Sequence, residues 1–168
     1  MPLARITLQD ICMSKLLSLL VVAFISLSTA TAETLSHNGI LLSDVWIRAT
    51  PPHHGVSAGY LTIQNSNNSA DRLVAVTADF AAQSEIHEMK MDGDIMKMRQ
   101  MEDGLTIAGG SAVTLKPGGT HLMFMKLNQQ IVAGERYNIT LIFEQAGKID
   151  MTIQARKSAS GHHNKHSH

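Results

Sequence analysis

The sequence predicts an all-β fold, an antiparallel Greek-key β-sandwich of seven to nine strands. Apolar and polar residues alternate over short segments, as they do between Tyr137 and Phe143. Turn signals such as Asp92-Gly93 and the run from Lys116 to Gly119 separate these segments. No segment sustains the 3.6-residue period of an amphipathic helix, so a helical core is not expected.

Taken in chain order, the segments are bounded by residues that interrupt pairing. Pro51-Pro52 ends the first segment, because proline cannot donate to a strand ladder. Asn65 to Ser69 forms a polar turn after the second, and Gly147-Lys148 precedes the last. The expected strands span residues 45–48, 59–64, 73–77, 84–91, 95–99, 112–115, 121–127, 137–143 and 149–153.

Residues 1–32 have the pattern of a secretory signal peptide. Lys15 precedes an apolar run from Leu16 to Leu27, and Ala30-Thr31-Ala32 forms a small-residue cleavage site. Met13 could itself start this signal, leaving residues 1–12 as an upstream extension. The alternative is an uncleaved anchor, although the run is shorter than the roughly 20 residues of a spanning helix. We expect cleavage after Ala32, a periplasmic location and no membrane anchor afterwards.

The remaining chain divides into a β-sandwich domain at 33–157 and a tail at 158–168. The tail consists of Ser, Gly, Asn, Lys and His with one Ala, and such a composition predicts disorder. The only cysteine, Cys12, lies before the apolar run. The secreted part therefore excludes a disulfide, a zinc–thiolate site and a catalytic thiol.

The charge balance argues against nucleic acid as a partner. The chain has 14 Lys and Arg and 14 Asp and Glu, and the balance persists without residues 1–32. There is no polybasic patch for a membrane surface either. Methionine and histidine stand out instead, with ten and nine residues.

Four of these residues form two candidate pairs of metal ligands. If Asp92-Gly93 is a two-residue hairpin loop, His87 lies directly opposite Met98 on the same face. His121 and Met123 are two residues apart on another strand, so they also share a face. The sequence does not show whether that strand approaches the hairpin.

The chemistry of the two pairs indicates copper. Soft sulfur ligands select Cu(I), and imidazole also suits copper. Zinc is disfavoured, because its protein ligands are Cys, His and carboxylate. The sequence therefore predicts a Cu(I) site made of His87, Met98, His121 and Met123. We assign the other methionines of the domain to packing or to the surface: Met89, Met91, Met96, Met101, Met125 and Met151.

The same residues carry a family resemblance. His87 is followed after ten residues by Met98, and after a further twenty-two by His121-Leu122-Met123. This spacing resembles that of the periplasmic copper chaperones of the PCuAC type (DUF461-like), with one extra residue in the loop of residues 104–110. The resemblance covers roughly residues 38–156. Further matching segments are Asp44–Pro52, Ala58–Thr62, Leu115–Gly119, His121–Met125 and Phe143–Gly147.

The resemblance implies a cupredoxin-like β-sandwich that binds Cu(I) through two His and two Met. It also implies delivery of copper to the cytochrome oxidase subunit that carries the dinuclear copper centre, alongside a Sco-type protein. His53-His54 departs from the family pattern, and we interpret it as a solvated loop pair.

The tail offers a second candidate metal site without sulfur. It contains His162, His163, His166 and His168. His-rich tracts bind metals, and imidazole suits Cu(II). We expect Cu(II) binding there, weaker than at a preformed site because binding has to order the segment.

Two other functions stay open from the sequence. The chain could be a β-sandwich interaction module without a metal, or a periplasmic copper-resistance or storage protein. An enzyme is not expected: a blue-copper site needs a cysteine, and Glu88 alternates to the face opposite His87.

Overall fold

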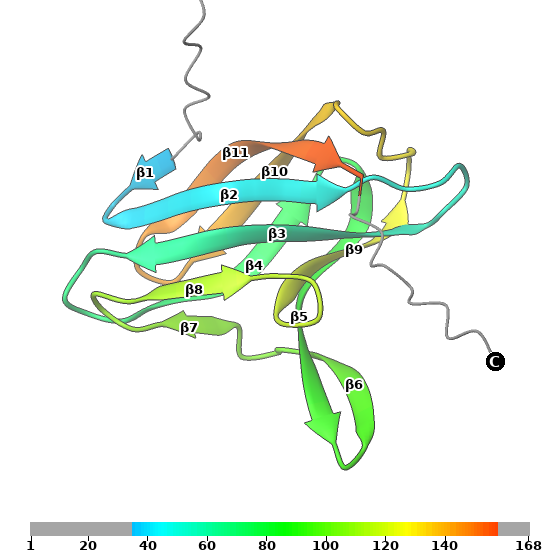
Figure 1. The fold of residues 1–168 in the computed structure, drawn as a ribbon. Coiled ribbons are helices and arrows are strands. Elements are labelled where there is room, and N and C mark those ends of the chain that lie inside the picture. The colour runs from blue at the N-terminus through cyan, green and yellow to red at the C-terminus, as the bar shows by residue number, and fades with distance from the viewer. Residues whose placement is uncertain (1–34, 158–168) are drawn as a thin grey trace, which may run out of the picture. The chain divides into compact units, whose positions relative to one another are not determined.

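A computed structural model describes residues 35–157, which contain only strands and connecting segments (Figure 1). Eleven strands form one hydrogen-bonded sheet there. They are β1 (Leu35–His37), β2 (Ile40–Arg48), β3 (Val56–Asn65), β4 (Asp71–Ala78), β5 (Ala81–Asp92), β6 (Ile95–Gln100), β7 (Leu105–Ile107), β8 (Ala112–Leu115), β9 (His121–Leu127), β10 (Arg136–Phe143) and β11 (Gly147–Arg156).

The prediction of an all-β fold is confirmed, but the strand count of seven to nine is too low. The nine expected segments all correspond to strands, and the two additions are β1 and β7, with three residues each. Three residues are too few for alternation to be visible in a sequence. One pair, β2 with β11, is parallel, so the sheet is not purely antiparallel.

The strand order is β6-β5-β9-β3-β2-β11-β10-β4-β7, with β1 on β2 and β8 on β3. β9 lies between β5 and β3, and β11 lies between β2 and β10. Such non-sequential neighbours distinguish a Greek-key arrangement from a simple meander. This order places β9, which carries His121 and Met123, directly beside β5, which carries His87.

The sheet curls so that its inner face encloses one hydrophobic core. Phe80 is fully buried in this core, and its ring centroid lies 5.1 Å from that of Phe124 and 5.3 Å from that of Tyr137. Gly59 on β3 is required here, because a Cβ on it would lie 2.9 Å from the Phe124 ring. Leu122 and Phe124 point into this core, which leaves His121 and Met123 of the same strand on the other face.

The β5–β6 hairpin projects from the body of the sheet (Figure 1). Its register differs from the prediction, because Asp92 pairs with Ile95 and the loop is Gly93-Asp94. Gly93 has φ of 64° and Asp94 does not have a positive φ, the combination of a type II′ turn with glycine first.

The expected pairing of His87 with Met98 is therefore wrong. His87 pairs with Gln100, Met89 pairs with Met98, and Met91 pairs with Met96. Relative to the expected register, the partner of each β5 residue on β6 is shifted by two positions. Because two is an even number, His87 and Met98 still lie on the same face.

The expected signal peptide and the histidine tail lie outside the described residues. No helix capable of crossing a membrane occurs among residues 35–157.

Candidate metal centre

Two histidines meet across the β5–β9 pair. His87 and His121 are directly opposed, and their ring centroids are 5.9 Å apart. His87 is also the residue at which β5 leaves β9 and continues along β6. The approach of the two predicted halves, which the sequence left open, therefore occurs at this pair.

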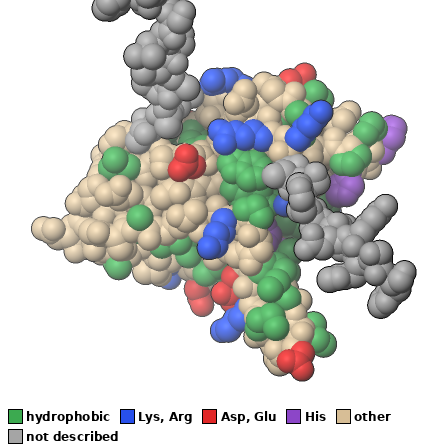
Figure 2. All heavy atoms as spheres, viewed as in Figure 1, with side chains coloured by type: hydrophobic (Ala, Val, Ile, Leu, Met, Phe, Trp, Pro, Cys, Tyr) green, Lys and Arg blue, Asp and Glu red, His purple; other side chains and the backbone are tan. Residues whose placement is uncertain are grey.

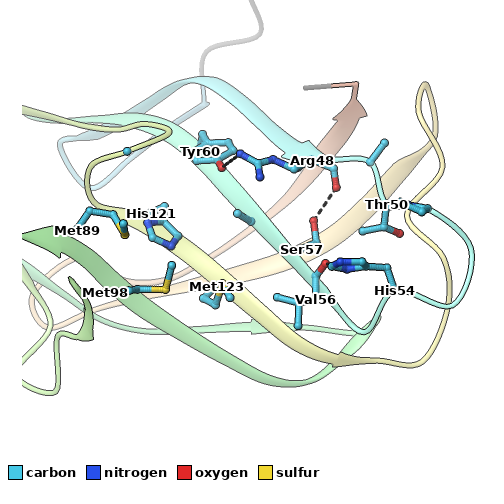
Figure 3. A pocket seen from close by; sticks show the side chains of 14 residues that line it. Arg48, Thr50, His54, Val56, Ser57, Tyr60, Met89, Met98, His121 and Met123 are labelled. Carbon is cyan, nitrogen blue, oxygen red and sulfur yellow. Dashed lines mark hydrogen bonds between the residues drawn. The ribbon is translucent and has the colours of Figure 1, made fainter. Parts of the chain in front are cut away.

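The two predicted methionines lie beside the histidines. Met98 and Met123 line a cavity of about 370 Å³ together with His121. Figure 3 shows Met98 extending from β6 toward the part of β9 that carries His121 and Met123. Met98 is 46% exposed and Met123 is half-buried, so both thioethers are accessible from solvent.

His121 is held in one tautomer by its surroundings. It is only 5% exposed, and its Nδ1 lies 2.9 Å from the carbonyl oxygen of Gly119. Since a carbonyl only accepts, Nδ1 carries the proton and donates it. Nε2 is then left with its lone pair, the form in which an imidazole binds a metal.

His87 has a similar arrangement with its nitrogens exchanged. Its Nε2 lies 2.7 Å from the carboxylate Oε2 of Glu85, which orients the ring. Its Nδ1 is buried and has no hydrogen-bond partner. A buried polar atom without a partner is costly unless a ligand completes it. The unpartnered nitrogen therefore fits a metal site at this position.

Glu85 is a site residue that the sequence prediction missed. It lies two residues before His87 on β5, so it is on the same face, and the same alternation that excluded Glu88 could have identified it. The hydrogen bond from His87 lowers the pKa of the Glu85 carboxyl, and the hydrogen bond from Gln83 lowers it further. A carboxylate that holds a ligating histidine is a frequent feature of metal sites.

Tyr60 and Arg48 form the wall of the cavity beyond His121 (Figure 3). The Tyr60 ring centroid is 6.5 Å from that of His121, and Arg48 donates a 2.8 Å hydrogen bond to the Tyr60 hydroxyl. Burial raises the pKa of Tyr60, and Arg48 partly opposes this effect. Tyr60 therefore stays neutral and adds an aromatic surface beside the histidine.

Met89 also belongs to the cavity lining, although the sequence assigned it to packing or the surface. It pairs with Met98 across the hairpin and is half-buried. The cavity thus has three thioethers near it, from Met89, Met98 and Met123.

The remaining candidates lie elsewhere. His53 and His54 are exposed, in agreement with a solvated loop, although His54 reaches the rim of the cavity. Within residues 35–157, no three side chains among His, Cys, Asp and Glu cluster as a metal site. His162, His163, His166 and His168 lie outside the described residues.

Solved structures with the same fold include PCuAC domains. The copper-bound PCuAC domain from PmoF2 matches with a TM-score of 0.64 and 22% identity, over 74% of this chain and 98% of that one. The CuI-DR1885 solution structure from Deinococcus radiodurans matches with a TM-score of 0.58 and 26% identity, over 77% and 85%. The cupredoxin-like fold and the resemblance to PCuAC proteins are therefore confirmed.

Curated sequences give related matches. "Putative lipoprotein Lxx21020" of Leifsonia xyli subsp. xyli is 24% identical over 127 residues, 76% of this chain and 75% of the relative. "Uncharacterized protein RP573" of Rickettsia prowazekii is 31% identical over 102 residues, 59% of this chain and 56% of the relative. The family model described as "Putative lipoprotein LpqE-like" matches residues 40–155. The chain belongs to the LpqE-like family.

Proposed function

We propose that this protein is a periplasmic carrier of Cu(I), which it binds through His87, Met98, His121 and Met123. The observation that carries the proposal is the opposed pair of histidines, each with one ring nitrogen free, beside two accessible thioethers. Two nitrogens and two sulfurs form a donor set that favours Cu(I) over harder ions.

The likeness to proteins solved with copper supports the same ion. DR1885 has been solved with CuI, and a PCuAC domain of PmoF2 has been solved with copper. Thioethers also suit a secreted carrier, because they neither titrate nor form disulfides. The ion is cargo in this proposal, and the protein is not an enzyme.

The acceptor follows from the family resemblance. We propose delivery to the cytochrome oxidase subunit with the dinuclear copper centre, with a Sco-type protein as a further partner. The exposure of Met98 supports transfer to another protein, since an incoming ligand can approach the ion from that side.

A Cu(I) competition titration of the secreted chain, combined with X-ray absorption, tests the site. We expect one tightly bound Cu(I) with sulfur and nitrogen ligands in equal number. The absence of tight copper would instead support an interaction module. A second experiment mixes the copper-loaded protein with the isolated copper-free acceptor domain. Transfer of Cu(I) to that domain would support delivery, whereas retention of Cu(I) would support storage or resistance.

We further propose that the tail histidines, His162, His163, His166 and His168, bind Cu(II). The tail would collect oxidised copper that reaches the main site after reduction by an external reductant. Deletion of residues 158–168 should remove a Cu(II) equivalent and leave the Cu(I) affinity unchanged. If Cu(II) binding persists in the shortened protein, His53 and His54 become the next candidates.

A further inference from the structure

We propose that Met91 and Met96, at the outer end of the β5–β6 hairpin, form a second Cu(I) site that receives the ion and passes it inward. The inference rests on the proposed function, because the inner site is the destination. Neither methionine belongs to the four-residue site.

The geometry of the hairpin brings the two sulfurs together. Met91 and Met96 are direct cross-strand partners, as are Met89 and Met98 in the next pair of the same face. Directly opposed residues have Cβ atoms about 4.5–5.5 Å apart. Two flexible thioethers at that separation can reach one ion from both sides.

The opposite face of the hairpin carries its charges. Asp92 binds Lys97 at 2.7 Å and Arg99 at 3.2 Å, and all three side chains are about half exposed. These ion pairs link the two strands without using the sulfur face. The methionines are therefore free to serve another purpose.

Their exposure is unusual for apolar side chains. Met91 is 55% exposed and Met96 52%, and four of the six exposed large hydrophobic residues in the described chain belong to this hairpin. Figure 2 shows these apolar side chains gathered on the projecting hairpin. Solubility favours polar residues at such positions, so a functional reason is needed. Soft-metal binding is a property that methionine has and other apolar residues lack.

The donors form a graded series along one face. Met91 and Met96 come first, Met89 and Met98 follow, and the histidine pair His87 and His121 comes last. Burial increases in the same direction, from about half exposed to 5% exposed at His121. Two thioethers bind more weakly than two thioethers with two imidazoles, so the ion is drawn toward the inner site.

The test is a titration of the full secreted chain, labelled with ¹³C at the methionine methyls, with Cu(I) under anaerobic conditions. The first equivalent should shift the Met98 and Met123 methyls, and further Cu(I) should shift those of Met91 and Met96. The double variant Met91→Leu/Met96→Leu keeps apolar volume but removes sulfur. This variant should no longer bind the Cu(I) equivalent assigned to the outer site, and it should take up Cu(I) more slowly from a small chelate. Its affinity for the first equivalent, at the inner site, should be unchanged.

The matched control is Met101→Leu/Met151→Leu, which changes two methionines that pack against the core. It should load like the unaltered protein. The proposed outer site would be rejected if the Met91 and Met96 methyl signals did not shift on addition of Cu(I), or if the Met91→Leu/Met96→Leu variant loaded Cu(I) at an unchanged rate. The proposed inner site is tested separately: it would be rejected if the Met98 and Met123 methyl signals did not shift with the first equivalent of Cu(I).

Discussion

His87 and His121 lie directly opposite each other on β5 and β9, with their ring centroids 5.9 Å apart. Because each ring uses one nitrogen in a hydrogen bond to the protein, each has one nitrogen left for an ion. This relationship makes a Cu(I) site testable with single substitutions.

Removal of either methionine ligand should weaken Cu(I) binding. We expect Met98→Ala and Met123→Ala each to raise the dissociation constant at least about tenfold, equivalent to about 1.4 kcal/mol. Met151→Ala is the control, because Met151 packs against the core on β11. Competition with a chromophoric Cu(I) chelator measures all three, and equal affinities would reject the assignment.

Glu85 should matter for affinity although it is not a proposed ligand. Glu85→Ala removes the acceptor that orients His87, and loss of such a partner typically costs about 10–100-fold in metal affinity. Glu88→Ala provides the control, since it deletes a carboxylate from the same strand on the opposite face. If the two variants bind Cu(I) equally, the Glu85 contact does not support the site.

Tyr137 should make stability depend on alkaline pH. Burial raises its pKa, although the hydrogen bond from the Val132 amide lowers it. The folded state thus holds this proton more tightly than the unfolded state. The contribution of Tyr137 to the free energy of unfolding should be fully present below about pH 10 and be lost as pH rises through the folded-state pKa.

The comparison variant is Tyr137→Phe, which should be about 1 kcal/mol less stable near neutral pH because it loses hydrogen bonds. Its stability should decline less steeply above about pH 10. Urea unfolding followed by the fluorescence of Trp46 measures both profiles. Parallel declines would assign the alkaline loss to other groups, such as Tyr60, whose pKa is also raised.

Asp71 should be required for stability and not for copper. Its buried carboxylate accepts hydrogen bonds from the backbone amides of Arg72, Gln145 and Ala146. Asp71→Ala leaves donors unpaired and should cost at least about 2 kcal/mol. The exposed Asp150→Ala should cost about 0.5 kcal/mol or less. A Cu(I) affinity that falls in the Asp71 variant while it remains folded would contradict this separation.

Alternation was enough to predict the strands and the faces of their residues. Tyr137 and Phe143 are buried on β10 as expected, and His87 and Met98 share a face. β7 was not predicted because it pairs with β4, which is distant in the sequence, so tertiary contacts outweigh any local preference in so short a segment. β1 pairs with the adjacent β2 across Asn38-Gly39, a local hairpin signal that the prediction did not use.

The register of the β5–β6 hairpin was harder to predict than the face of the sheet on which each side chain lies. Asp92-Gly93 and Gly93-Asp94 are both good hairpin loops, of type I′ and type II′, and the sequence contains both. The choice between them moves the partner of His87 from Met98 to Gln100. Strand patterns alone could not predict the contact between His87 and His121, since nothing local specifies that β9 inserts between β5 and β3. Only the shared donor chemistry and the family resemblance suggested that the two residues meet.

β5 belongs to two pairings, with β9 up to His87 and with β6 from His87 onward. The body of the sheet therefore contributes His121 and Met123, whereas the projecting ribbon contributes Met98. An ion bound by Met98, His121 and Met123 would cross-link the projecting hairpin to the body of the sheet. A receiving protein that binds the hairpin and bends it outward would separate Met98 from the other ligands. Copper would then be transferred by a conformational change, without electron or proton transfer.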